Sequence, residues 1–391
     1  MNRNDQHVYL DYSATTPVDV DVLEVINQHM TTTYGNASSV HSFGRSAKVV
    51  LEESREKIAN IIGAEPAEIF FTSGGTESDN HALLGSAFLH RRTSGKNHLL
   101  VSAIEHHAVL DCAEYLRGLG CTISVIPVDA KGYVKPEVVE GLLTEKTFLV
   151  SVMHANNETG AIQPIEEIAR MSVQHGICFH SDTVQTIGKI PVGVKDLGVD
   201  LLAISAHKIY GPKGIGALYI KKGTDLDAIL HGGAQERNNR AGTENIPLIA
   251  GFAKAIELAE KNREQLYQTA QECKATLAEI IRSSLNGVIF NSDNGPTLPH
   301  ILSVSLDASR YDVESETLLL KMDLNGIAVS SGSACTSGSI QPSHVLLAMG
   351  RDMKTTQATI RFSFGKFTTI DEVTRAGETF CSIVRALPQR S

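Results

Sequence analysis

The sequence has no long apolar run, no basic block and no paired cysteines, and each absence excludes a class of protein. No stretch of about 18 consecutive apolar residues occurs, so we expect no membrane-spanning helix. The net charge is -9 and lysine and arginine are scattered, which argues against stable binding to nucleic-acid phosphates. The six cysteines lack the spacing of metal ligands or of a disulfide framework, and no permanent metal site is therefore expected.

The amino-terminal segment does not resemble a secretory signal or a transit peptide. Residues 1–7 are polar and lead directly into Val8 and Tyr9, whereas targeting segments carry a distinct apolar or arginine-rich pattern. We therefore expect a cytoplasmic protein.

What the chain does have is a regular alternation of short β-rich runs with helical patterns. The candidate strands cover residues 69–71, 98–104, 122–128, 147–153, 177–181, 201–204 and 216–220. Helical patterns such as 77–91, 108–119 and 165–175 separate several of these runs. This alternation predicts an α/β fold with a mainly parallel sheet and helices on both of its faces.

A chain of 391 residues is too long for one small domain,. After Asn245 the sequence changes to a long helical stretch, residues 246–283, which is followed by shorter mixed segments. The sequence therefore predicts a large domain over residues 16–260. A smaller α+β domain would combine residues 1–15 with residues 261–391.

Lys208 is the residue that points most directly to chemistry. It follows the apolar run 201–204 and precedes a segment rich in glycine and proline, so it is expected at a strand end. An amine there can form a Schiff base with a carbonyl cofactor such as pyridoxal phosphate. Alone, Lys208 would be read as a surface lysine. Asp182, however, ends another apolar run and offers the carboxylate that keeps the pyridine nitrogen of this cofactor protonated,.

Further polar residues follow the ends of the predicted strands. They are Thr76, His106, Asn157, Gln185, Ser205 and His207. In an open parallel sheet the carboxyl ends of the strands meet at one edge, where ligands bind. The sequence therefore predicts that these residues form one site together with Asp182 and Lys208.

Residues 73–76, which include Gly75 and Thr76, have the form of a phosphate cradle. Glycine lets the backbone approach an anion, and the helix that follows presents unpaired amides. Ser205 and His207 could add donors. A tight turn explains the glycines alone equally well.

His106 and Gln185 each have an ordinary explanation beside a functional one. His106 precedes a predicted helix, and it could stack on a planar ring and shuttle protons near neutral pH,. Its spacing alone favours a helix-capping or solvated histidine. Gln185 could donate to the phenolate oxygen of the cofactor, although a surface glutamine is the commoner case.

Eight motifs in a fixed order carry a resemblance to a known family. They cover residues 9–17, 72–80, 105–106, 156–160, 205–216, 240–245, 330–338 and 360–363. Together they resemble the cysteine desulfurases of the NifS/IscS type, which belong to the class-V aminotransferase group. The resemblance implies the type I fold of pyridoxal-phosphate-dependent transferases, similar to aspartate aminotransferase, and a homodimer with shared active sites.

The resemblance also implies roles for individual residues. Lys208 would be the Schiff-base lysine, Asp182 the partner of the pyridine nitrogen, Gln185 the phenolate contact and His106 the stacking acid-base group. The phosphate would be held by Gly75, Thr76, Ser205 and His207, and by Thr243 of the neighbouring subunit. Asn157, which would also contact the cofactor, and Arg361 would hold the substrate carboxylate, a task that suits a planar guanidinium.

Cys335 separates a desulfurase from a transaminase. It stands among small polar residues with no apolar periodicity to bury it, so we expect an exposed loop and a thiolate that can act as a nucleophile. In the family the corresponding cysteine takes the sulfur of cofactor-bound cysteine, becomes a persulfide and passes the sulfur to an acceptor. Transient ligation of an iron-sulfur cluster by Cys335 stays open.

The leading hypothesis is therefore a cysteine desulfurase that converts L-cysteine into L-alanine and a persulfide on Cys335. The sulfur acceptor would be a protein, such as an iron-sulfur scaffold or an enzyme of tRNA or thio-cofactor synthesis. Another class-V activity, an aminotransferase or selenocysteine lyase, would use Lys208 without Cys335. A sulfur-delivery or scaffold-binding module without catalysis is the third possibility, although such a module has no need for all of these polar groups.

Overall fold

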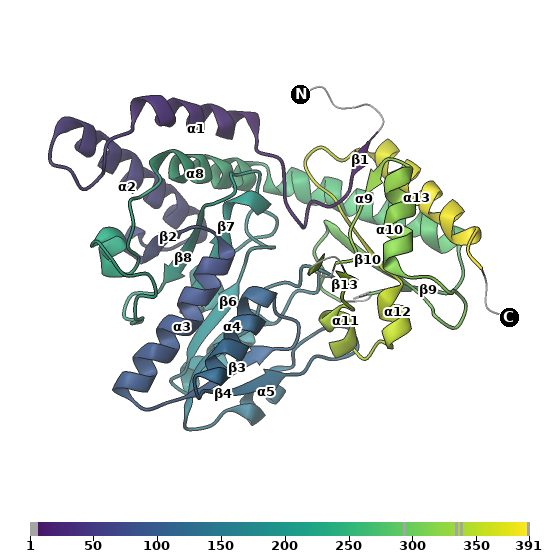
Figure 1. Ribbon diagram of the computed structural model, residues 1–391, viewed down its shortest axis with the longest axis horizontal. Helices are drawn as coiled ribbons and strands as arrows, with labels where there is room; N and C mark the ends of the chain where they lie inside the picture. The colour runs from purple at the N-terminus through teal and green to yellow at the C-terminus, as the bar shows by residue number, and fades with distance from the viewer. Residues whose placement is uncertain (1–6, 292–294, 333–334, 337–338, 389–391) are drawn as a thin grey trace.

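The computed structural model describes residues 7–291, 295–332, 335–336 and 339–388, and for residues 335–336 and 339–340 only the backbone. Figure 1 shows a larger lobe built on a seven-stranded sheet and a smaller lobe with a three-stranded sheet. Within the described residues, no helix is both long and apolar enough to cross a membrane.

The large sheet follows the predicted strands. Its order is β2 (Ile69–Thr72), β8 (Gly216–Ile220), β7 (Leu201–Ser205), β6 (Cys178–Asp182), β5 (Thr147–Ser151), β3 (His98–Ser102) and β4 (Thr122–Ile126). All neighbours pair in parallel except β8, which is antiparallel to both β2 and β7. The prediction of an α/β fold with a mainly parallel sheet is confirmed.

The direction of β8 has a simple cause. Between β7 and β8 the only helical element is the one-turn 3₁₀ helix Ala206–Lys208. A parallel return needs a crossover of about a dozen residues or more, usually with a full helix. The short connection therefore turns the chain back on itself, and Lys208 sits in that turn at the end of β7.

Helices cover both faces of the large sheet (Figure 1). On one face Leu99 and Val101 share a core with α3 (Gly75–Thr93) and α4 (His107–Gly118). On the other face Leu100 belongs to a second core, to which several helices contribute. These are α2 (Ser42–Ile62), α6 (Ile165–Gln174), α7 (Val194–Leu197) and α8 (Ile246–Lys261), with α1 (Val20–Thr32) packed on α8 and α5 (Pro136–Leu142) beside α6. Burial on both faces explains why the strands read as nearly continuous apolar runs.

The small lobe has its own hydrophobic core. Its sheet has the antiparallel order β14 (Thr359–Ser363), β10 (Ile301–Leu306) and β9 (Val288–Phe290). Around it lie α9 (Arg263–Ser284), α10 (Ser315–Leu324), α11 (His344–Ala348), α12 (Met353–Gln357) and α13 (Ile370–Arg385). The amino-terminal β1 (Val8–Tyr9) joins this lobe by pairing with β11 (Ile327–Ala328). Val8 and Leu10 are accordingly buried among residues from the last third of the chain.

The helical stretch after Asn245 differs from the prediction in one respect. It is not one helix but two, α8 and α9, which meet at Asn262. Asn262 leaves the helical backbone conformation, with φ -103° and ψ 5°. The two helices then belong mainly to different cores, α8 to that of the large lobe and α9 to that of the small lobe.

Candidate active site

A solvent-open cleft of about 1110 Å³ lies at the carboxyl ends of the parallel strands, where residues of both lobes meet. It brings together ten of the predicted site residues: Gly75, Thr76, His106, Asn157, Asp182, Gln185, Ser205, His207, Lys208 and Arg361. The large lobe supplies all of them except Arg361, which comes from β14. These residues are widely spread along the sequence, so only the fold brings them together.

The start of α3 forms one wall of the cleft and is suited to an anion. Gly74 is the N-cap residue and offers no side-chain acceptor to the first amides of the helix. A Cβ at position 75 would lie 2.8 Å from Val184 Cγ2, and one at Gly216 would lie 2.7 Å from Gly74 Cα. Glycine is therefore required where the turn packs against its neighbours. The uncapped amides at the positive end of the helix fit a phosphate group.

The amine of Lys208 is held by the backbone of the amino-terminal segment. Its Nζ donates to the carbonyl oxygens of Ser13 (2.5 Å) and Ala14 (2.8 Å). Burial, reinforced by the positive charge of Arg361, lowers the pKa of Lys208 to about 8. A far larger fraction of this amine is neutral near pH 7 than of an ordinary lysine, which favours attack on a carbonyl.

Asp182 ends β6 and lines the cleft, where its Oδ1 accepts from the amide of Val184 at 2.8 Å. Burial raises the pKa of the Asp182 carboxyl above its usual range. A cationic nitrogen placed beside the carboxylate would lower that pKa again. Asp182 therefore fits the protonated pyridine nitrogen of pyridoxal phosphate.

Two more buried carboxyls lie near Asp182. Burial raises the pKa of Glu105 to about 8, and burial together with the charge of Asp182 raises that of Asp79. His180 Nε2 lies 3.4 Å from Asp79 Oδ1, but burial lowers the pKa of His180 to about 3. At neutral pH the His180 ring is therefore uncharged, and this contact is not an ion pair.

His106 combines the two alternatives weighed from the sequence. It is the N-cap of α4, and its Nδ1 accepts from the amide of Ala108 at 3.1 Å. It also lines the cleft. Burial, with a contribution from the charge of Lys208, lowers the pKa of His106 to about 4. The ring is therefore neutral at pH 7, and the cap assigns its proton to Nε2.

Gln185 and His207 are both anchored to the amino-terminal segment. Gln185 Nε2 donates to the carbonyl of Ser13 at 3.0 Å, which leaves its second N–H available,. His207 Nδ1 lies 3.1 Å from Thr15 Oγ1. Residues 13–15 thus fix three cleft side chains, because Lys208 is held by the same segment.

Arg361 is fixed from both sides and still has free donors. Its Nη1 donates to the carbonyl of Asn157 at 2.8 Å and its Nη2 to Asp11 Oδ1 at 2.7 Å. Its Nε is buried without a partner. A guanidinium has five N–H groups, so donors remain for a carboxylate.

Of the two remaining predicted residues, Thr243 does not line the cleft, and Cys335 is described only by its backbone. The backbone of Cys335 lies in the short strand β12 (Cys335–Thr336), which pairs with β13 (Ser339–Ile340). Its side chain lies outside the described residues, and so does its predicted role as a cluster ligand. Ser330 and Gly332 line the cleft, so the segment that leads to Cys335 starts at the cleft wall. Thr243 is exposed in the loop before α8.

Sequence reasoning missed several residues that line or support the cleft. Asp79 lies one helical turn after the cradle, and the spacing from Thr76 could have placed both on one face of α3,. His344 could not be found this way, because it reaches the cleft from the small lobe. Its Nε2 donates to the carbonyl of Glu105 at 2.9 Å, and its ring lies 5.0 Å from that of His107. Glu158 accepts from Ser343 Oγ at 2.5 Å.

The fold and the cleft define a class of enzyme in which a lysine at a strand end faces an anion cradle and a buried aspartate. The class-V aminotransferase model matches residues 8–376. The chain belongs to this family, and the recognition made from the motifs is confirmed.

Individual relatives and solved structures are similar over nearly the whole chain. Cysteine desulfurase IscS of Dictyoglomus turgidum is 46% identical over 94% of this chain and 92% of its own length. Putative cysteine desulfurase IscS 1 of Bacillus subtilis is 44% identical over 98% of this chain and 100% of its own. Among solved structures, a NifS-like protein has a TM-score of 0.90 at 38% identity, covering 97% of this chain and 100% of its own. A NifS-like protein from Rickettsia africae has a TM-score of 0.87 at 32% identity, with the same coverage.

Proposed function

We propose that the protein is a pyridoxal-phosphate-dependent cysteine desulfurase that yields L-alanine and a persulfide on Cys335. The observation that carries this proposal is the arrangement of one cleft. Lys208, Asp182 and Arg361 line it together, and the segment leading to Cys335 starts at its wall. The similarity to proteins named cysteine desulfurase supports the same reaction.

The cleft residues fit each part of the cofactor. The free amides of α3, with Thr76, Ser205 and His207, would hold the phosphate, and Asp182 would hold the ring nitrogen. The second N–H of Gln185 would reach the phenolate oxygen, and Lys208 would hold the carbonyl carbon. When bound, pyridoxal phosphate supplies an electron-withdrawing ring that stabilises negative charge at the Cα of an amino acid.

The residues of the chain would then bind the substrate and move its protons. Arg361 would hold the carboxylate of L-cysteine through its free N–H groups, with Asn157 beside it. The Lys208 amine, with its lowered pKa, would move the proton at Cα. His106 can donate through Nε2, whereas accepting the thiol proton at Nδ1 would release the cap on α4. The thiolate of Cys335 would take the sulfur.

The first test compares the protein with its Cys335→Ala variant. Each is incubated with L-cysteine and a thiol reductant, and sulfide and alanine are quantified. We expect equal yields of both products from the wild type, and loss of persulfide and sulfide in the variant with retention of the yellow cofactor. Cys121→Ala, a half-buried cysteine outside the cleft, serves as the matched control. Full turnover by Cys335→Ala would instead favour an aminotransferase or selenocysteine lyase, and absence of a cofactor band would favour a non-catalytic module.

The active unit would be a homodimer in which Thr243 reaches the phosphate of the neighbouring subunit. Two observations support this. Thr243 is exposed and outside the cleft of its own chain. Seven large apolar side chains are exposed between residues 20 and 49: Val20, Leu23, Met30, Tyr34, Val40, Phe43 and Val49.

The remaining parts of the proposal concern the setting of the enzyme. The persulfide sulfur would pass to an acceptor protein such as an iron-sulfur scaffold, in the cytoplasm. The large domain would comprise residues 16–260, and the small domain residues 1–15 and 261–391. The separate hydrophobic cores of the two lobes support this division.

A further inference from the structure

The loop that carries Thr243 begins with an unusual backbone. Glu236, Arg237 and Asn238 have φ values of 44°, 55° and 67°. They are three of the four non-glycine residues with positive φ in the described part of the chain. Residues with a Cβ avoid positive φ values, and several consecutive residues keep this conformation only where the surrounding structure holds them.

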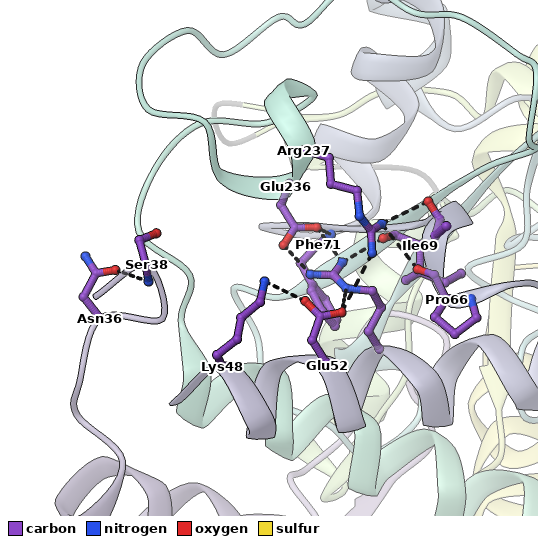
Figure 2. A network of polar contacts seen from close by, with 11 residues as sticks. Asn36, Ser38, Lys48, Glu52, Pro66, Ile69, Phe71, Glu236 and Arg237 are labelled. Carbon is purple, nitrogen blue, oxygen red and sulfur yellow. Dashed lines mark hydrogen bonds and ion pairs between the residues drawn. The ribbon is translucent and has the colours of Figure 1, made fainter. Parts of the chain in front are cut away.

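What holds this segment is a buried ion pair. The carboxylate of Glu236 accepts from Arg55 Nη1 at 2.7 Å, from Arg55 Nη2 at 2.8 Å and from the amide of Phe71 at 2.9 Å. Both charged side chains are only 3% exposed. Figure 2 shows Glu236 directed at Phe71 within a network that also includes Glu52. Arg55 completes the network by donating to Glu52 and to the carbonyl of Ile69.

The anchor of this pair is the strand that leads into the phosphate cradle. Ile69 and Phe71 belong to β2, and the cradle follows β2 directly. The Glu236 carboxylate accepts a hydrogen bond from the Phe71 amide of β2. It therefore ties the loop to the strand that positions the first amides of α3. The two hydrogen bonds from Arg55 and the third from Phe71 fix the orientation of the Glu236 carboxylate as well as its distance from β2,.

A second contact ties the same loop to the cradle itself. Arg240 donates to Glu77 through Nε at 2.8 Å and through Nη2 at 3.2 Å. Glu77 lies in the first turn of α3, next to Thr76, and also accepts from the amide of Ser73. The loop is thus clamped at residue 236 to the strand and at residue 240 to the cradle, and Thr243 follows three residues later.

We propose that the Arg55–Glu236 pair is a positioning device that holds the strained segment 236–238 so that Thr243 faces the cofactor phosphate of the neighbouring subunit. This inference rests on the proposed function, in which that phosphate contact exists. Neither Arg55 nor Glu236 lines the cleft. Their effect would reach the cofactor only through the loop, and so they would couple the cradle of one subunit to the cradle of the other.

The test is a double-mutant cycle between Glu236→Gln and Thr243→Ala. The readout is the rate at which each purified variant loses its cofactor absorbance during dialysis, together with the sedimentation coefficient. We expect each single variant to lose the cofactor roughly tenfold faster, as for one lost charge-assisted hydrogen bond. The double variant should lose it no faster than Thr243→Ala alone, because Glu236 acts through Thr243.

Two further variants separate positioning from general stability. Glu260→Gln makes the same chemical change in a bidentate pair with Arg263 at the junction of α8 and α9, and it should leave cofactor loss unchanged. Replacing the buried pair by apolar residues, Arg55→Met with Glu236→Leu, removes the uncompensated charge that could unfold Glu236→Gln. This double replacement should fold with a normal thermal midpoint of the apoprotein and still lose the cofactor faster.

Each other result would contradict the inference. Additive rates in the cycle would mean that Glu236 acts independently of Thr243, and normal cofactor retention in the apolar replacement would mean that the pair only stabilises the fold. If Thr243→Ala retains the cofactor normally while sulfide is still formed from L-cysteine, the positioning role is wrong and the desulfurase function stands. If the wild type and Glu260→Gln bind no cofactor, the proposed function itself is wrong.

Discussion

At the scale of single residues, the environment of Lys208 decides its chemistry. Its pKa is lowered to about 8 by burial and by the charge of Arg361. At pH 7 roughly one amine in ten is then neutral, against roughly one in three thousand for an unperturbed lysine. The carbonyls of Ser13 and Ala14 hold the amine in place without neutralising it. The cleft therefore keeps a reactive lysine ready near neutral pH.

This environment predicts the pH dependence of cofactor uptake. The rate at which apoprotein binds pyridoxal phosphate should rise between about pH 6 and pH 9 and level off above about pH 9, because deprotonation of Lys208, whose pKa is about 8, is then nearly complete,. Arg361→Gln removes a positive charge that lowers the pKa, so its midpoint should move to higher pH. Stopped-flow absorbance after mixing apoprotein with pyridoxal phosphate across this pH range measures the midpoint for the wild type and for Arg361→Gln. A wild-type rate that keeps rising tenfold per pH unit to pH 10 would contradict the lowered pKa.

At the scale of secondary-structure elements, His106 links the start of α4 to the cleft. The Ala108 amide donates to its Nδ1, so the ring both caps the helix and meets the site. The two tasks can be separated by substitution. His106→Asn should keep the cap and the thermal midpoint, because asparagine is a good N-cap residue, but lose turnover. His106→Ala should lose turnover and also about 1 kcal/mol of stability.

Thermal unfolding of the apoproteins and sulfide production from L-cysteine measure these two effects. His107→Asn is a control for the cap alone, since the His107 ring lies at the same helix end and lines the cleft but does not cap the helix. Equal stability of the alanine and asparagine variants would mean that the cap contributes nothing. Retained turnover in His106→Asn would exclude a role of the ring in the reaction.

Elements also show why the sequence predicts some features and not others. Every strand of the large sheet was predicted, because burial on both faces leaves short apolar runs bounded by polar turns. The strand-end rule likewise predicted that Lys208, Asp182 and His106 would share a cleft. Neither rule encodes strand direction, and so the antiparallel β8 was not predicted. It depends on the length of the β7–β8 connection, which alternation does not reveal.

Contacts between residues far apart in the sequence had no signal in it. His344 donates to the carbonyl of Glu105, although 239 residues separate them. Asp11 pairs with Arg361 across 350 residues. Such contacts, whether within one lobe or between the two, join residues that are far apart in the sequence, and no local spacing reports them. The same reason hid the Arg55–Glu236 pair, whose partners lie 181 residues apart.

At the scale of the whole molecule, the exposed apolar side chains between residues 20 and 49 call for a partner surface. Val40 is 88% exposed and Phe43 is 53% exposed, with the ring of Tyr34 packed 5.6 Å from that of Phe43. They lie on or between α1 and α2, at the outer edge of the large lobe in Figure 1. Extensive apolar patches on a protein surface mark interaction sites. A second copy of the chain would cover this one in the proposed homodimer.

Charges placed on that surface should separate the subunits. Val40→Asp combined with Phe43→Asp would place two charges in the subunit interface, where their desolvation is costly. We expect the variant to sediment as a monomer and to lose its cofactor as fast as Thr243→Ala, because Thr243 of the neighbouring subunit is then missing. Leu324→Asp is the matched control, since Leu324 is 76% exposed on α10 of the small lobe. A dimeric Val40→Asp, Phe43→Asp variant would place the interface elsewhere, and a monomer with full cofactor retention would show that each active site is complete within one chain.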